Sequence, residues 1–144
     1  MINSAYCTSF KKQLLEGAHD FRVGGNVFKI ALYTEAANLN SSTTAYTTAG
    51  EIVGSGYTAG GLVLTQSSPV EFGSSGIVTF SNASWVGSTI AARGALIYNS
   101  TPVHTYTNPA CIVLDFGITR VTSINTFEIR FPAATDQTAI IRVY

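Results

Sequence analysis

The residues that most suggest chemistry are the glycines of "EIVGSGYTAGGLVL", residues 51–64. A phosphate-binding P-loop has the pattern GxxxxGK[ST], in which the lysine and the hydroxyl contact phosphate and magnesium, and no lysine lies near these glycines. The spacing of Gly54, Gly56 and Gly60 also departs from the dinucleotide fingerprint, and the apolar run that follows predicts a strand instead of a helix N-terminus. We therefore interpret the stretch as a turn that allows positive φ and close backbone approach, with Tyr57 packed over the bend.

The triplet Asp115-Phe116-Gly117 is shared with protein kinases, where the aspartate binds magnesium. That role also requires a lysine-bearing strand, a catalytic loop and a chain about twice as long, which this sequence lacks. We interpret the triplet as the end of a strand. In this interpretation Phe116 is buried, Asp115 faces water or caps a turn, and Gly117 begins the turn.

Histidine and cysteine are scarce, with two of each. Neither His19 nor His104 lies in a metal-binding or catalytic pattern, so we expect surface or capping roles for both. Cys7 and Cys111 form no CxxC motif and are expected to be buried free thiols, with pairing as the alternative. We predict no catalytic residue, no cofactor and no metal, and thus no enzyme. Trp85 is expected in the core, although sugar stacking or an interface remains open.

Composition limits the partners that the protein can have. Charged residues make up 11% of the chain and the formal net charge is zero, against a usual charged share of about 25%. There is no basic field for nucleic acid or anionic lipid and no apolar stretch approaching the ~20 residues of a membrane helix. The N-terminal residues lack the pattern of a signal peptide, so we expect synthesis in a cytoplasm. A surface of so little charge fits either a neutral β-protein or a protein covered by partners in an assembly.

The elements that must position these residues begin with one helix. Tyr6, Phe10 and Leu14 recur at i, i+4 and i+8, which predicts a short amphipathic helix over about 4–17. Asn3 or Ser4 is expected to cap its start and Gly17 to follow its end in the left-handed conformation. A helix this short is marginal alone, so we expect it to serve as a docking element.

Short apolar runs separated by turn residues then predict strands, and residues 1–144 are expected to form a single domain. The strands are expected at 27–33, 62–65, 77–80, 92–98, 111–116, 126–131 and 139–143. In "TFEIRF", Phe127, Ile129 and Phe131 are predicted to face inward, and Pro132 to end the strand. The fold class is therefore all-β, an antiparallel β-sandwich or jelly-roll-like barrel with one short N-terminal α-helix. The polar tract at 34–50 is predicted to be a mobile or interaction loop.

Several motifs together resemble a known family. A helix containing KxxLL is followed by FKIALY, GSGYTAGG, FSNASWVGSTIAARGALIY, VLDFG and a closing pair of strands. This order, over almost the whole chain, resembles that of small virion proteins of tailed bacteriophages. In size and expected architecture the chain is most similar to the cement, or decoration, proteins that sit as trimers on phage capsids and are typically built on a β-sandwich or jelly roll.

The resemblance implies a virion structural protein that binds itself, as a homotrimer, and the major capsid protein or other virion proteins. The helix and the 34–50 loop are then the expected attachment elements. The expected interface residues are aromatic or apolar side chains on and around these elements. They are Tyr6, Phe10, Leu14, Tyr46, Tyr57 and Trp85. Two alternatives remain: a tail, fibre or knob component, and a lectin-like host-surface module that stacks Trp85 or Tyr57 on sugars.

Overall fold

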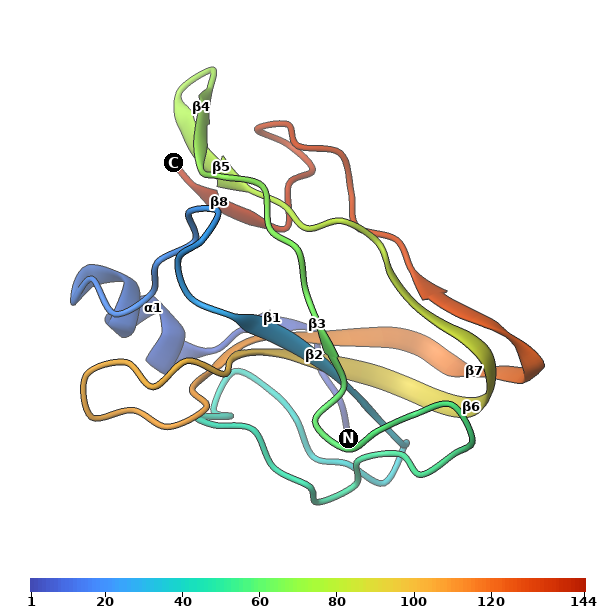
Figure 1. Cartoon of the computed structure of the whole chain (residues 1–144). Helices are drawn as coiled ribbons and strands as arrows, with labels where there is room; N and C mark the ends of the chain where they lie inside the picture. The colour runs from blue at the N-terminus through green and yellow to red at the C-terminus, as the bar shows by residue number, and fades with distance from the viewer.

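The computed structural model describes residues 1–144 and is mostly β, with one short helix (Figure 1). The elements follow one another along the chain as β1 (Ala5–Tyr6), α1 (Thr8–Leu15), β2 (Phe28–Tyr33), β3 (Leu62–Val63), β4 (Val70–Phe72), β5 (Ser75–Val78), β6 (Ala83–Asn99), β7 (Ala110–Ile129) and β8 (Ile141–Val143). The strands form two antiparallel sheets, with the orders β1-β7-β6-β2-β3 and β4-β5-β8. The predicted mostly β, antiparallel chain with one short helix is thus confirmed. Neither sheet closes into a barrel.

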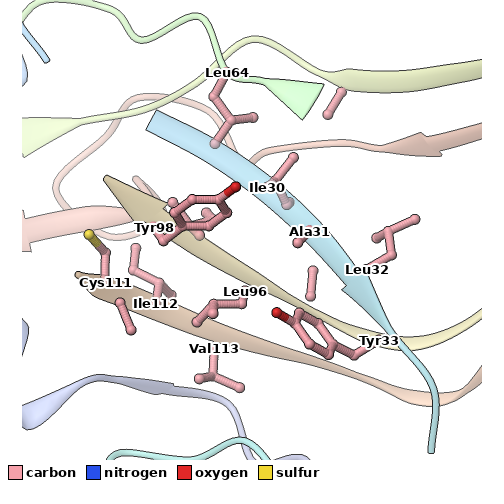
Figure 2. Close-up of a cluster of buried hydrophobic side chains, with 14 of the residues drawn as sticks. Ile30, Ala31, Leu32, Tyr33, Leu64, Leu96, Tyr98, Cys111, Ile112 and Val113 are labelled. Carbon is pink, nitrogen blue, oxygen red and sulfur yellow. The ribbon is translucent and has the colours of Figure 1, made fainter. Parts of the chain in front are cut away.

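The core lies on the three central strands of the larger sheet. β2 pairs with β6 from Phe28 opposite Asn99 to Tyr33 opposite Gly94, and β6 continues the pairing onto β7. Side chains from all three strands gather in one cluster (Figure 2). The reason is visible in the sequence, because FKIALY, GALIYN and ACIVL are almost unbroken apolar runs, as expected for strands buried on both faces.

The long strand β7 corrects the sequence prediction. Two strands were expected, at 111–116 and 126–131, but Ala110–Ile129 is continuous and bends where Gly117 and Ile124 adopt φ values of 79° and 47°. β6 is likewise longer than expected, from Ala83 to Asn99, and keeps pairing with β7 through the bends. Residues with turn conformations therefore produce bulges inside β7 and do not end the strand, because β6 pairs with β7 before and after each bend. We call residues 86–91 of β6 with residues 117–126 of β7 the distal ribbon.

The helix also differs from its prediction. It begins only at Thr8, because Ala5 and Tyr6 pair with β7 as strand β1. Cys7 occupies the N-cap position without a side-chain hydrogen bond, so the predicted cap by Asn3 or Ser4 is wrong. The Ser4 hydroxyl instead accepts a hydrogen bond from the Asp115 N–H. The C-terminal prediction is confirmed, since Gly17 follows the helix with a φ of 69°.

Other local predictions are mostly confirmed. Strands were expected where β2, β3 and β8 lie, although β3 and β8 are shorter. β5 begins two residues before the strand expected at 77–80 and ends at Val78, and β4 was not predicted. Within TFEIRF, Phe127 is buried, Ile129 and Phe131 are partly buried, and Glu128 and Arg130 are exposed, as predicted from their alternation.

The 34–50 loop is anchored to its surroundings. The N-terminal amine donates to the Ala37 carbonyl, and Leu39 exchanges hydrogen bonds with the first residues of the chain. Further along, the Tyr46 N–H donates to the carbonyl of Asn108, in the loop between β6 and β7. Ala37 and Leu39 are buried. These contacts do not support the expectation of a mobile loop, because buried side chains and hydrogen bonds to two other segments restrain it.

Candidate functional site

The glycine-rich stretch adopts the conformation expected of a turn. Gly60 and Gly61 have φ values of 90° and 75°. A Cβ at Gly61 would lie 1.8 Å from the Ile30 carbonyl oxygen, so only glycine fits against β2 at this point. The prediction of a conformational device is therefore confirmed.

Glu51, at the start of this stretch, is the acceptor of a connected polar cluster. The hydroxyls of Tyr46 and Tyr57 donate to Glu51 Oε2 and Oε1 at 2.6 and 2.7 Å, and the Gly60 N–H donates to Oε1 at 2.7 Å. Burial, and next the hydrogen bond to Glu51, raises the pKa of both tyrosines well above its usual value. Both hydroxyls thus remain protonated donors. The Leu32 N–H also donates to the Tyr57 oxygen at 3.0 Å, so the cluster joins the glycine-rich stretch to β2.

The histidines show no catalytic arrangement. His19 contacts Gln13 through Nε2 at 2.8 Å and Asn99 through Nδ1 at 3.0 Å, and no carboxylate is hydrogen-bonded to it. Burial, with a smaller effect of His104, lowers the pKa of His19 to about 4, so its ring is neutral at pH 7. His104 is exposed, as predicted. His19 is instead partly buried and joins α1 to the end of β6.

The Asp115-Phe116-Gly117 triplet is structural here too. Asp115 Oδ1 accepts a hydrogen bond from the Gly117 N–H at 2.9 Å and another from Arg93 Nε at 2.8 Å. The hydrogen bond from Arg93 holds the pKa of Asp115 below its usual value. Asp115 therefore caps the first bend of β7, as predicted, but the strand continues beyond that bend.

Trp85 lies in the core, in agreement with the preferred prediction. Its side chain is 3% exposed and packs near the rings of Tyr57 and Phe127, with centroids 6.1 and 6.0 Å away. An indole this buried presents no face to a sugar. The Tyr57 hydroxyl is likewise engaged by Glu51 and Leu32, so neither residue offers the free aromatic platform of the lectin-like alternative.

The six predicted interface residues are all buried or partly buried in the isolated chain. Phe10 and Trp85 are core residues, whereas Tyr6 and Leu14 pack partly buried against the core. The structure brings Tyr46 and Tyr57 together at Glu51 and places Tyr6 beside Phe10, with ring centroids 6.3 Å apart. Contacts of these residues with a partner stay a prediction.

The distal ribbon exposes apolar side chains that sequence reasoning missed. Ile118, Val121 and Ile124 of β7 and Val86 of β6 are 57%, 69%, 84% and 77% exposed. Along residues 118–123, β7 is hydrogen-bonded to β6 alone and its outer edge is open. The available signal was ITRVTSI, a β-branched run with a single charge and no proline, which is unusual for an exposed edge strand.

A groove of about 760 Å³ accompanies the bend of β7. Residues on both sides of the bend line it, with Phe116 before the bend, Phe127 and Phe131 after it, and Ile140 from the segment before β8. Its lining includes no histidine, cysteine or serine. Half of the lining residues are hydrophobic, and the lining also includes the charged residues Asp115, Arg120, Glu128 and Arg130. The groove thus adjoins the exposed apolar surface of the distal ribbon.

The small sheet has a comparable exposed edge. All three residues of β4 are exposed, with Val70 and Phe72 at 51% and 45%. The side chain of Glu71 between them makes no ion pair or hydrogen bond, and the same holds for the side chain of Arg120 on the distal ribbon. Two apolar edges therefore each carry one unpaired charge.

Neither metal-binding geometry nor a membrane-spanning helix is found. No three His, Cys, Asp or Glu side chains gather where they could share a metal ion. The only α-helix has eight residues and is too short to cross a membrane. Cys7 and Cys111 are free and buried, as predicted, and burial raises the pKa of the Cys7 thiol to about 11.

No protein-family model, curated protein or solved structure matches this chain. The resemblance to phage virion proteins is carried by the sequence motifs alone and stays a prediction. Function must therefore be inferred from the residues and surfaces of the chain itself, among which the distal ribbon is the strongest candidate for a functional site.

Proposed function

We propose that this protein is a non-enzymatic structural component of a tailed-phage virion, a decoration protein that binds the outside of the capsid as a homotrimer. The observation that carries the proposal is the distal ribbon, where apolar side chains project into water from a strand whose outer edge is open. Large exposed apolar surfaces are rare on monomers and mark sites of protein association. The motif resemblance supplies the kind of assembly.

The remainder of the molecule supports this role. A decoration protein needs a rigid scaffold and an adhesive face of low charge. The two antiparallel sheets, which we propose to be a variant of the β-sandwich or jelly-roll scaffold, provide the first. The distal ribbon provides the second, since Arg120 is its only charged residue. The helix α1 carries a fully accessible Leu15, 92% exposed, and is the proposed second attachment element.

In this proposal the protein stabilises the shell by mass action. It binds assembled capsid and not free subunits, so each bound copy favours the assembled state. Several weak contacts per copy, multiplied over a trimer, then give strong overall binding without a single dominant site.

The proposal is tested by light scattering of the purified protein, followed by addition to expanded, undecorated capsids. The expected result is a stable trimer that co-sediments with the capsids. Val121→Asp should abolish association, because it places a charge in the apolar surface, while leaving the fold intact by circular dichroism. Val23→Asp is the matched control, since Val23 is also 71% exposed but lies outside the distal ribbon.

A monomer that ignores capsids would overturn the proposal. Density on the tail in a cryo-EM map of the particle would replace the capsid position with the tail alternative.

A further inference from the structure

Two exposed strand edges of the protein carry opposite charges. On β7, Arg120 stands between the exposed Ile118 and Val121. On β4, Glu71 stands between the exposed Val70 and Phe72. Each edge thus combines exposed apolar side chains with one charge, positive on the first and negative on the second.

Both edges are open to another strand. β4 is the terminal strand of its sheet and pairs only with β5, from Val70 opposite Ile77 to Phe72 opposite Ser75. β7 is covered on its outer side by β1 only at Ile112 and Val113. Open edges in natural proteins are usually protected by charged side chains, proline or bulges. Residues 118–123 contain no proline and a single charge, Arg120, and the bulges of β7 lie on either side of this segment, at Gly117 and Ile124.

The two edges do not meet within one molecule. The β4–β5 hairpin stands at one side of the view in Figure 1 and the far end of the β6–β7 pair at the other. Neither Glu71 nor Arg120 has an ionic partner in the chain, whereas the other exposed pairs, such as Asp20 with Arg22 and Glu128 with Arg130, are satisfied locally. Each charge is therefore free to pair with an opposite charge on another molecule.

We infer that a second copy of this chain is the occupant, with the β4 edge of one copy lying beside residues 118–122 of β7 in the next and Glu71 paired with Arg120. The contact extends the five-stranded sheet of one copy by a strand from its neighbour, and backbone hydrogen bonds supply affinity. The Glu71–Arg120 pair fixes the register, since opposite charges across strands are favourable and like charges are not.

The symmetry of the contact follows from its two different edges. A contact between unlike surfaces is heterologous and gives a closed ring when the rotation between copies closes. That the ring contains three copies is taken from the trimer of the proposed function. The pairing of the two edges does not depend on that number.

The first experiment is a charge exchange measured by sedimentation velocity. Arg120→Glu and Glu71→Arg should each weaken self-association about tenfold or more, because each places like charges opposite one another. The double variant Glu71→Arg/Arg120→Glu should return to within about threefold of the wild type, because it restores an opposite pair. Arg22→Glu is the control: it changes the charge by the same amount at an exposed residue outside α1 and outside both strand edges, and it should have no effect on self-association.

The second experiment is cross-linking of introduced cysteines by mild oxidation. The double variant Glu71→Cys/Arg120→Cys should form covalent dimers and trimers, whereas each single variant should form none. The native Cys7 and Cys111 do not interfere, because both are buried.

The outcomes separate this inference from the proposed function. Self-association that is indifferent to all charge changes, or cross-linking by Arg120→Cys alone, would overturn the β4–β7 contact, the latter in favour of two-fold pairing of β7 with itself. A wild-type chain that stays monomeric would overturn both the contact and the trimer. A charge-sensitive oligomer that ignores capsids would support the contact and contradict the decoration role.

Discussion

The two halves of the β6–β7 pair are built by the same strands and differ in what covers them. In the proximal half, residues 94–99 of β6 lie between β2 and residues 110–115 of β7, and nearly every side chain is buried. In the distal ribbon the pairing continues, but β2 has ended and most of the β7 side chains are exposed. Both halves carry isoleucine and valine.

The difference shows that strand-forming residues do not by themselves decide burial. Ile97 and Ile118 have the same side chain and lie on neighbouring strands, yet the first is inaccessible and the second is 57% exposed. Apolar burial stabilises by roughly 25 cal/mol per Å², so the distal ribbon retains apolar surface that a partner can still remove from water. The proximal half contributes to stability through buried apolar surface, and we propose that the distal ribbon serves association.

The largest expected effect compares those two isoleucines. Ile97→Ala should lower the free energy of unfolding by about 2–5 kcal/mol, because it leaves a cavity in a packed core. Ile118→Ala should change it by no more than about 0.5 kcal/mol in the monomer. Urea denaturation at low protein concentration measures both, and similar losses for the two variants would show that the distal ribbon is packed in solution.

A second comparison uses a glycine from each half. A Cβ at Gly94 would lie 2.5 Å from the Leu114 carbonyl oxygen, so Gly94→Ala should cost about 1–3 kcal/mol through overpacking. Gly117 has open space around it and only its φ of 79° opposes a side chain, so Gly117→Ala should cost about 1 kcal/mol. Thermal unfolding of both variants tests the order, and a costlier Gly117→Ala would mean that conformation outweighs packing.

A third comparison concerns the hydrogen-bonded cluster of Glu51, Tyr46 and Tyr57, which joins the glycine-rich stretch to β2. Glu51→Gln should cost about 1–3 kcal/mol, since an amide replaces a carboxylate that accepts three hydrogen bonds. Glu71→Gln, on the exposed β4 edge, should leave monomer stability within about 0.5 kcal/mol of the wild type. Denaturation midpoints of the two variants provide the measurement. Equal midpoints would show that the hydrogen bonds of Glu51 do not contribute to the stability of the folded chain.

The smallest expected effect is a pH dependence at the end of the proximal half. The pKa of His19 is about 4 in the folded chain, so the unfolded chain takes up a proton first as the pH falls below about 6.5. Stability should therefore decrease from pH 6.5 towards pH 4, by about 1–2 kcal/mol once partial exposure is allowed for.

The pH range isolates this histidine from the acidic groups. Asp20, whose pKa is lowered to about 2 by Arg22, contributes stability that is lost only as the pH falls below about 4. His19→Gln should flatten the stability profile between pH 5 and 6.5. An unchanged slope in that variant would assign the dependence to another group.

The sequence predicts local features of the fold where a residue acts through its own backbone or its immediate neighbours. Gly17 and Gly61 at positive φ, the alternation of TFEIRF and the buried Trp85 all belong to this kind. The start of α1 and the continuity of β7 were mispredicted because they depend on pairing with distant residues: β1 with β7, and β6 along the whole length of β7. Gly117 does bend the chain, as predicted, but the strand continues beyond it because β6 pairs with β7 on both sides of the bend.

The candidate site was harder to predict than the fold. The predicted interface residues Tyr6, Phe10, Leu14, Tyr46, Tyr57 and Trp85 are buried or partly buried, and their contact with a partner stays a prediction. The exposed apolar side chains of Ile118, Val121 and Ile124 were not predicted. From sequence alone, an apolar run of this kind is the same as that of a buried strand. Only the strand pairing reveals which run is left uncovered, since β1 pairs with the outer edge of β7 at Ile112 and Val113 and not along residues 118–123.

Trp85 is an intrinsic fluorescence probe of the region where the distal ribbon joins the core. It is the only tryptophan of the chain, and it is buried against Phe127 and Tyr57, next to where the distal ribbon leaves the core. Its indole Nε1 has no hydrogen-bond partner. The native tryptophan fluorescence should accordingly be blue-shifted. A change in the packing around Trp85, caused by denaturant or by a neighbouring molecule that binds the distal ribbon, should change this emission and can be followed without an attached dye.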